Sequence, residues 1–245
     1  MRNIWILFNR ELKNYFITPI AYVFITIFLL MNGIFTFYVG SFFQRGIADL
    51  VPFFSAHPWI YMIFIPAITM RLWAEEKKQG TIELLFTLPI TSMQAVIAKL
   101  LAAWCFIVIS LVLTFPLLIA VNYLGNPDNG VILAGYLGSS LMAGAFIAIG
   151  ACISATTTNQ VIAFVGSFLM CLLFNVSGFP MLIDYISKIL PDVVVDVIQS
   201  FSFLTNFDVI IKGLLDAKVL IYFISVMLAW VIANVVVLET NKARD

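Results

Sequence analysis

Charged side chains are scarce in this chain, and their densest group lies in residues 66–91, which read PAITMRLWAEEKKQGTIELLFTLPIT. Four of them are consecutive there: Glu75, Glu76, Lys77 and Lys78. Carboxylate and ammonium groups in such a run can make polar contacts with a partner protein. They can equally form a solvated collar at a membrane surface. The residue types alone leave both interpretations open.

Arg71 lies one helical turn before this run. Its long side chain could reach water at the edge of a membrane, or it could pair with Glu75 at the four-residue spacing that favours ion pairs on a helix. Either arrangement places a cation where the chain leaves the membrane.

The residues that catalysis would need are missing from the pattern. There is no G-x-x-x-x-G-K-[ST] phosphate loop, and no Ser-His-Asp or paired-carboxylate grouping is recognisable. The only histidine, His57, is expected to be an interfacial residue near the outer end of a membrane span rather than a ligand. Cys105, Cys152 and Cys171 all lie in apolar runs and are expected to be buried small apolar residues. We therefore expect no catalytic residue, no metal and no cofactor, and no ATP hydrolysis by this chain itself.

The composition indicates an all-α polytopic membrane protein. Of the residues, 62% are hydrophobic and 11% are charged, whereas about 25% are charged in soluble domains. The formal net charge is zero, so no nucleic-acid partner is expected. One transmembrane domain, residues 1–245, is predicted, with six spans. The spans are placed at residues 20–43, 53–73, 93–122, 131–156, 161–183 and 219–238.

An amphipathic helix is predicted before the first span, over residues 3–17. Trp5, Phe8 and Leu12 fall on its apolar side and Arg10 on its polar side, a pattern that suits a helix lying in the membrane interface. A residue before proline is pushed out of the helical region, so Thr18 should end the helix. This elbow helix can serve as an orientation anchor, as a contact for a cytoplasmic partner, or as both.

A cytoplasmic loop, residues 75–90, is predicted between the second and third spans. Its apolar piece, residues 82–88, would be only about 10 Å long, far short of a bilayer core of about 30 Å. Gly80 should supply the turn before this short helix, and Glu83 suits the positive end of its dipole. Thr91 with Gln94 forms a capping-box pattern for the next span. The apolar surface of the short helix has to be covered, so we expect a partner subunit there.

The lysines and arginines indicate the orientation. With the amino terminus in the cytoplasm, 9 of the 13 lie on the cytoplasmic side and 4 outside. This bias predicts that both termini and the 75–90 loop are cytoplasmic.

Two further segments have a predicted packing role. Residues 184–216 are too polar for a span and too apolar for a free loop, and they predict two short outer helices or a re-entrant hairpin, the first opened by Pro191. The fourth span carries small residues four apart, which let helices approach closely in lipid. These pairs are Ala134 with Gly138, Ser140 with Gly144, and Gly150 with Ser154. These small residues could pack helices of the same chain together, or they could form a face for self-association between two chains.

The 66–91 run resembles the coupling-loop signature of ABC-2-type transporter permeases. The matching positions are Glu75, Glu76, Gly80, Thr81, Glu83, Leu84, Leu85 and Pro89, followed by Lys99 in the next helix. Weaker resemblance continues at residues 157–160 and 201–215. Within that family the chain is most similar to gliding-motility and copper-enzyme-maturation permeases.

The resemblance implies a bacterial inner-membrane protein with six spans that pairs with a second permease chain, identical or related. It also implies two copies of a separate cytoplasmic ATP-binding-cassette ATPase, contacted by the elbow helix and by the short helix with Leu84, Leu85 and Leu88. A re-entrant pair before the last span would form the outer gate. The remaining direct partner is membrane lipid.

Other functional classes remain in competition with an ATP-driven exporter. A subunit of the same type could transmit conformational change without carrying a solute. A secondary transporter or channel is disfavoured because the predicted spans carry almost no charge. A membrane-embedded enzyme lacks any catalytic grouping. The transported substrate is not readable from the sequence.

Overall fold

The computed structural model describes residues 2–87 and 89–242, without the side chains of residues 2 and 84–86. Every regular element within those ranges is a helix, which confirms the all-α prediction. Five helical stretches are long and apolar enough to cross a membrane, and up to seven if two bent helix pairs each count as one span. The protein is therefore a multi-pass membrane protein. The number six lies inside this range and stays a prediction.

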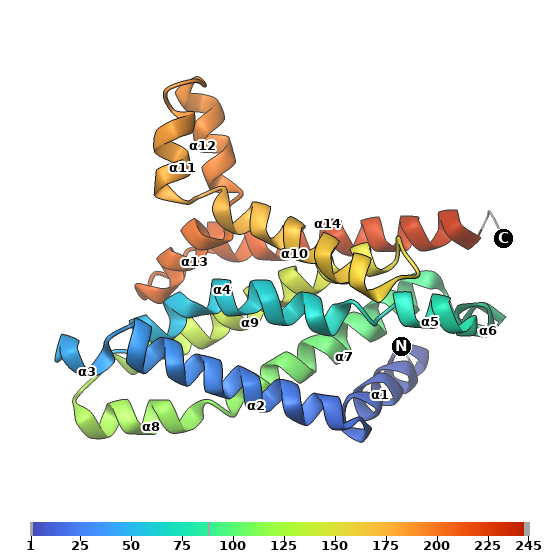
Figure 1. Ribbon diagram of the computed structural model, residues 1–245, viewed down its shortest axis with the longest axis horizontal. Coiled ribbons are helices and arrows are strands. Elements are labelled where there is room, and N and C mark those ends of the chain that lie inside the picture. Colours follow the sequence, from blue (N-terminus) through green and yellow to red (C-terminus); the bar gives the residue numbers. More distant parts are fainter. Residues whose placement is uncertain (1, 88, 243–245) are drawn as a thin grey trace.

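Figure 1 shows the order of the helices along the chain. The first half contains α1 (Arg2–Ile17), α2 (Pro19–Ile34), a π-helix η1 (Phe35–Val39), α3 (Phe42–Arg45), α4 (Val51–Thr69), α5 (Ala74–Gln79), α6 (Thr81–Thr87) and α7 (Ser92–Val112). The second half contains α8 (Phe115–Leu124), α9 (Asn129–Ser154), α10 (Gln160–Val176), α11 (Pro180–Ile186), α12 (Asp192–Ser200), α13 (Phe203–Ile211) and α14 (Ala217–Lys242).

Helix α9 forms the centre of the bundle and packs against α4, α7, α10, α13 and α14. Its glycines make these contacts close. A Cβ atom at Gly138 would lie 2.6 Å from Ile210, and one at Gly150 would lie 2.1 Å from the Thr69 hydroxyl. The small residues spaced four apart thus pack within the chain, as one of the two interpretations predicted.

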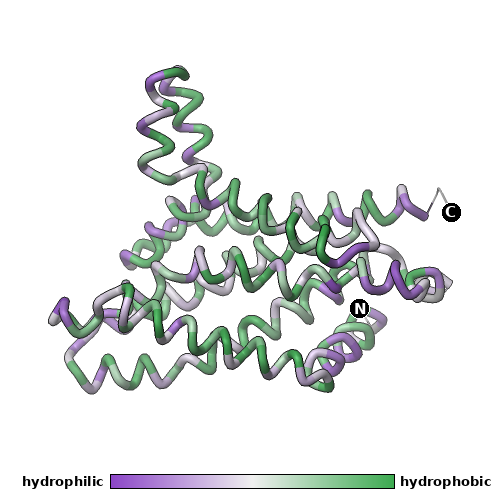
Figure 2. Tube along the Cα trace, in the orientation of Figure 1, coloured by the Kyte–Doolittle hydropathy of each residue, from purple (hydrophilic) through white to green (hydrophobic). Residues whose placement is uncertain are grey.

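The elbow helix and the two short helices of the predicted loop lie at the same end of the bundle. Helices α1, α5 and α6 lie there with the end of α14, whereas α3, α13 and the hairpin of α11 and α12 lie at the other end (Figure 1). Figure 2 shows hydrophilic residues along α1 and α5, further ones at the opposite end in α3, α13 and the α11–α12 hairpin, and mostly hydrophobic long helices between them. We call the end that holds α1, α5 and α6 the terminal end, because both ends of the described chain lie there.

Two predicted spans are interrupted. The helix expected over 161–183 ends at Val176, and the chain bends by 73° before α11. Pro180 holds the preceding residue in an extended conformation, and Gly178 lets the bend approach Ser202 so closely that a Cβ would lie 2.2 Å from its hydroxyl. The helix expected over 93–122 is likewise divided into α7 and α8 by a turn at residues 113–114.

The segment between the last two spans forms short helices. Pro191 precedes α12, as predicted. The next short helix, α13, ends at Ile211, and Gly213 follows it with a φ of 85°, a conformation that glycine adopts readily.

The expectation that His57 is an interfacial residue is wrong. Its side chain is fully buried between α2, α4 and α9. The ring nitrogens lie 2.7 Å from the Ser139 hydroxyl and 3.0 Å from the Asn32 side-chain oxygen. The imidazole is thus a hydrogen-bonded core residue that joins three helices, as buried polar groups must be paired.

Candidate functional site

The junction between α4 and α5 is held by one serine from another helix. Ser154, near the end of α9, donates its hydroxyl to the Met70 carbonyl at 3.0 Å. The same oxygen accepts the backbone N–H groups of Trp73 and Ala74, each at 3.1 Å. It therefore pairs both the end of α4 and the start of α5, whose backbone groups lack helical partners.

The loop after α5 has the turn that the sequence predicted. Gly80 has a φ of 71° and ends α5 in the left-handed conformation. The Thr81 hydroxyl then donates to the Glu76 carbonyl at 3.3 Å, and Glu83 lies in the first turn of α6. The predicted capping box is confirmed at the start of α7, where Thr91 accepts from the Gln94 N–H at 3.2 Å.

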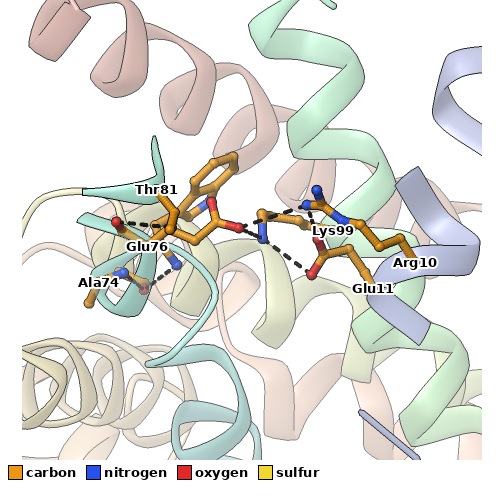
Figure 3. Close-up of polar contacts among 8 residues, drawn as sticks. Arg10, Glu11, Ala74, Glu76, Thr81 and Lys99 are labelled. Atoms are coloured by element: carbon orange, nitrogen blue, oxygen red, sulfur yellow. Dashed lines mark hydrogen bonds and ion pairs between the residues drawn. The ribbon is translucent and has the colours of Figure 1, made fainter. Parts of the chain in front are cut away.

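A group of four charged side chains joins three elements at the terminal end (Figure 3). We call Arg10, Glu11, Glu76 and Lys99 the Lys99 cluster. The Lys99 ammonium of α7 lies 2.7 Å from Glu76 of α5 and 3.3 Å from Glu11 of α1. Arg10 contacts Glu11 at 2.6 Å and lies 4.0 Å from Glu76. The Lys99 ammonium also lies 5.2 Å from the centre of the Trp73 ring, within cation–π range.

The Lys99 cluster is buried at Lys99 and Glu11, partly buried at Glu76 and exposed at Arg10. Lys99 is only 4% exposed, and a charge removed from water is stable only when it is paired. Burial by itself would raise the pKa of Glu11, but Lys99 and Arg10 outweigh it and hold that pKa below its usual value of 4.5. The network therefore ties the elbow helix, α5 and α7 together while all its members are ionised.

The elbow helix has apolar contacts with α7 as well. The rings of Tyr15 and Phe16 lie 5.1 and 5.8 Å from the ring of Phe106. Trp5 stacks on Phe8 at 5.2 Å and remains 64% exposed. The helix thus docks on the bundle along one side and leaves Trp5 on the surface.

The run of four charges is divided between two directions. Glu76 and Lys77 point into the protein, where Lys77 donates to the Ala155 carbonyl, and that oxygen also accepts from Asn241 of α14 at 3.2 Å. Lys78 is exposed, and the Glu75 carboxylate accepts a hydrogen bond from the Gln79 side chain at 3.4 Å. The inward pair fixes α5 on the bundle, and the outward pair remains available at the surface.

Arg71 does not form the predicted pair with Glu75. Within the described residues the Arg71 side chain forms no ion pair, and its buried Nε atom has no hydrogen-bond partner. Arg71 lines a cleft of about 570 Å³ that lies between α1, α2, α4, α5 and α7.

Several predicted contact residues are only partly described. The side chains of Leu84 and Leu85 and the whole of Leu88 lie outside the described residues. Leu12 is half-buried on the elbow helix, and Ile82 packs against the core. The expectation that these residues meet a partner stays a prediction.

Sequence reasoning missed two residues of the site. Glu11 and Ser154 were not selected, because their partners lie in distant parts of the chain. A signal for the first existed in Lys99, the lone charge of an otherwise apolar helix, since such a residue requires a partner of opposite charge. Ser154 carried no signal beyond its small size.

The described residues hold no group of three or more His, Cys, Asp or Glu placed to bind a metal ion. The site instead consists of an amphipathic helix and a helix–turn–helix, both fixed to one end of a bundle of long apolar helices. That combination defines a polytopic membrane protein with a charged helix–turn–helix at one end of its bundle.

A family described as ABC-2 family transporter protein matches residues 43–238. The chain belongs to this family, and it is a membrane subunit of an ABC transporter rather than an enzyme in itself. Comparison with curated proteins found no match.

Proposed function

We propose that this chain is the transmembrane subunit of an ATP-driven exporter in the bacterial inner membrane, with both termini in the cytoplasm. Two copies of a separate cytoplasmic ATPase would drive it through α5 and α6, and a second permease chain would complete the translocation path. The observation that carries the proposal is the Lys99 cluster, because it connects the charged helix–turn–helix to the bundle by buried ion pairs.

The connections of α5 suit it to transmit movement. Glu76 joins it to α7, and Lys77 joins it to the loop after α9. Ser154 holds its first turn against the end of α4. A displacement of α5 would therefore move three long helices together, whereas a loop without these contacts would move alone.

The short helix α6 supplies the expected contact with the ATPase. At seven residues it is too short to cross a bilayer. We propose that Leu84, Leu85 and Leu88 insert into a groove of the ATPase, each contributing roughly 1.5–3 kcal/mol if fully buried. Glu75, Lys78 and the exposed Trp5 of the elbow helix would line the edge of this contact.

A substitution in α6 tests this arrangement. Leu85→Asp should reduce recovery of the ATPase with the permease at least about tenfold, since an unpaired charge would enter an apolar groove. Val193→Asp, at an exposed position of α12, is the matched control and should leave recovery unchanged. Unchanged recovery and unchanged ATPase stimulation with Leu85→Asp would refute the proposed contact.

A second candidate is a membrane subunit that transmits conformational change without carrying a solute. The position of the buried charges favours it, since Glu11 lies in α1 and Lys99 in the first half of α7, both toward the terminal end. Vesicles containing the permease and its ATPase distinguish the two. ATP-dependent accumulation of a solute supports export, and ATP hydrolysis without accumulation supports transmission.

A further inference from the structure

The cleft beside the elbow helix is lined by two chemically different halves. One half is apolar and comes from α2 and α4, with Ile20, Phe24 and Ile68 among its residues. The other half, toward α5, carries the charged side chains. The change from apolar to charged along one cleft of about 570 Å³ matches the change along a phospholipid from acyl chain to headgroup.

The charged half is balanced rather than basic. Three cations line it, Arg10, Arg71 and Lys99, and three carboxylates, Glu11, Glu75 and Glu76. Lys99 and Arg10 are already paired within the cluster. The charged groups left for a ligand are therefore the Arg71 guanidinium and the outer carboxylate of α5.

Two buried polar atoms in this half lack partners among the described residues. One is the Nε donor of Arg71, and the other is the Oε2 acceptor of Glu76. A buried donor and a buried acceptor that are both unpaired are costly, so the Arg71 and Glu76 side chains keep hydrogen-bonding capacity that the protein does not use, although these two atoms themselves are not exposed.

We propose that the cleft binds a membrane phospholipid with a zwitterionic headgroup that carries a primary ammonium, as in phosphatidylethanolamine. The phosphate would accept from Arg71, and the ammonium would donate to Glu75 and Glu76. The acyl chain would lie along α2 and α4. An anionic headgroup would satisfy Arg71 but would face the carboxylates, and a trimethylated ammonium has no N–H to donate.

This binding would place a lipid against the junction of α1, α4 and α5, next to the Lys99 cluster. It uses Arg71 and the carboxylates of α5 rather than the leucines of α6, and Glu75 is the one residue that it shares with the proposed edge of the ATPase contact. If the ATPase recovery experiment fails, the lipid proposal still stands. If the lipid experiment fails, the proposed ATPase contact still stands.

Native mass spectrometry of the full-length chain tests the proposal. The protein is purified in detergent and titrated with phosphatidylethanolamine, phosphatidylcholine or phosphatidylglycerol of identical acyl chains. We expect about tenfold greater retention of phosphatidylethanolamine than of the other two. Equal retention of all three lipids, or a preference for phosphatidylglycerol, would overturn the proposal.

Variants locate the bound lipid in the cleft. Arg71→Gln should abolish the preference, whereas Arg45→Gln, at the opposite end of the bundle and paired with Asp49 at 3.3 Å, should retain it. If Arg71→Gln does not yield folded protein, Glu75→Gln provides the test, and it should shift the preference toward phosphatidylglycerol. A preference unchanged in the variant tested overturns the assignment. Soluble glycerophosphoethanolamine, which has the headgroup but no acyl chains, should not displace the lipid. Displacement would show that the site binds the soluble headgroup compound instead of a membrane lipid.

Discussion

Replacing Lys99 with methionine tests the Lys99 cluster directly. Methionine keeps an unbranched side chain of similar length, so the change removes the ammonium with little loss of packing. Glu11 and Glu76 would then be left beside each other without the cation that lies 3.3 and 2.7 Å from them. Arg10 would remain as their only neighbouring cation within the cluster.

The expected cost follows from burial. Removing one partner of a buried ion pair typically costs about 3–5 kcal/mol. The side chains of Glu11 and Glu76 retain 11% and 20% exposure, so water can partly solvate them once Lys99 is gone. We therefore expect a loss near the lower limit, about 3 kcal/mol.

The control is an exposed pair in the same protein. Lys212 and Asp208 form an ion pair with side chains 64% and 52% exposed, and such pairs contribute little. Lys212→Met should therefore change the free energy of unfolding by less than about 0.5 kcal/mol. The same assay thus compares a buried and an exposed lysine.

Unfolding in mixed detergent micelles, followed by the fluorescence of the five tryptophans, measures the loss. The double variant Lys99→Met with Glu76→Gln should cost about 1–2 kcal/mol less than the sum of the single variants, because the two groups interact directly. Hydrogen exchange in α1 should rise in Lys99→Met. If Lys99→Met is as mild as Lys212→Met, or if the two changes are additive, the cluster does not hold the elbow helix in place.

Three further expectations concern the same end of the bundle. The pKa of Glu11 lies below its usual value of 4.5, so its stabilising contribution is complete above pH 4.5 and declines as the pH falls further. The backbone amide hydrogens of α1 should therefore exchange faster in acid, after correction for intrinsic rates. Glu11→Gln should remove this pH dependence. Ser154→Ala leaves two buried N–H groups and one carbonyl unpaired, which should lower the free energy of unfolding by about 2–4 kcal/mol. Ser225→Ala, at an exposed position, should lower it by less than about 0.5 kcal/mol in the same unfolding assay. Gly150→Ala should lose about 1–3 kcal/mol through overlap with the facing helix, while Gly33→Ala, with nothing within 4 Å, should be neutral or stabilising; equal effects would contradict the close approach.

Local features were predictable from the sequence because their causes lie within a few residues. Thr91 and Gln94 form the predicted capping box, and Gly80 forms the predicted turn. The elbow helix ends at Ile17, before the Thr18 that the following proline holds extended. In each case the partners are neighbours in sequence, so spacing alone identifies them.

The polar contacts between helices were not predictable in the same way. Glu76 meets Lys99 from 23 residues away, and Ser154 meets the start of α5 from 80 residues away. Nothing in the spacing of an apolar span indicates which face meets which neighbour. For the same reason His57 was misplaced, since its partners Asn32 and Ser139 belong to two other helices.

The bend after α10 was present in the sequence as Gly178 and Pro180, but the continuous apolar run around them favoured a single span. Proline restricts the residue before it locally, whereas hydrophobicity is averaged over many residues. Where these signals conflict, the local restriction decides the end of the helix.

The early end of α10 has a consequence for the surrounding bilayer. Its 17 residues rise about 26 Å, while the 26 residues of the adjacent α9 rise about 39 Å. A hydrocarbon core of about 30 Å fits neither length. If α10 crosses the membrane without α11, we expect the lipid beside it to thin by several ångströms or to admit headgroups toward the bend.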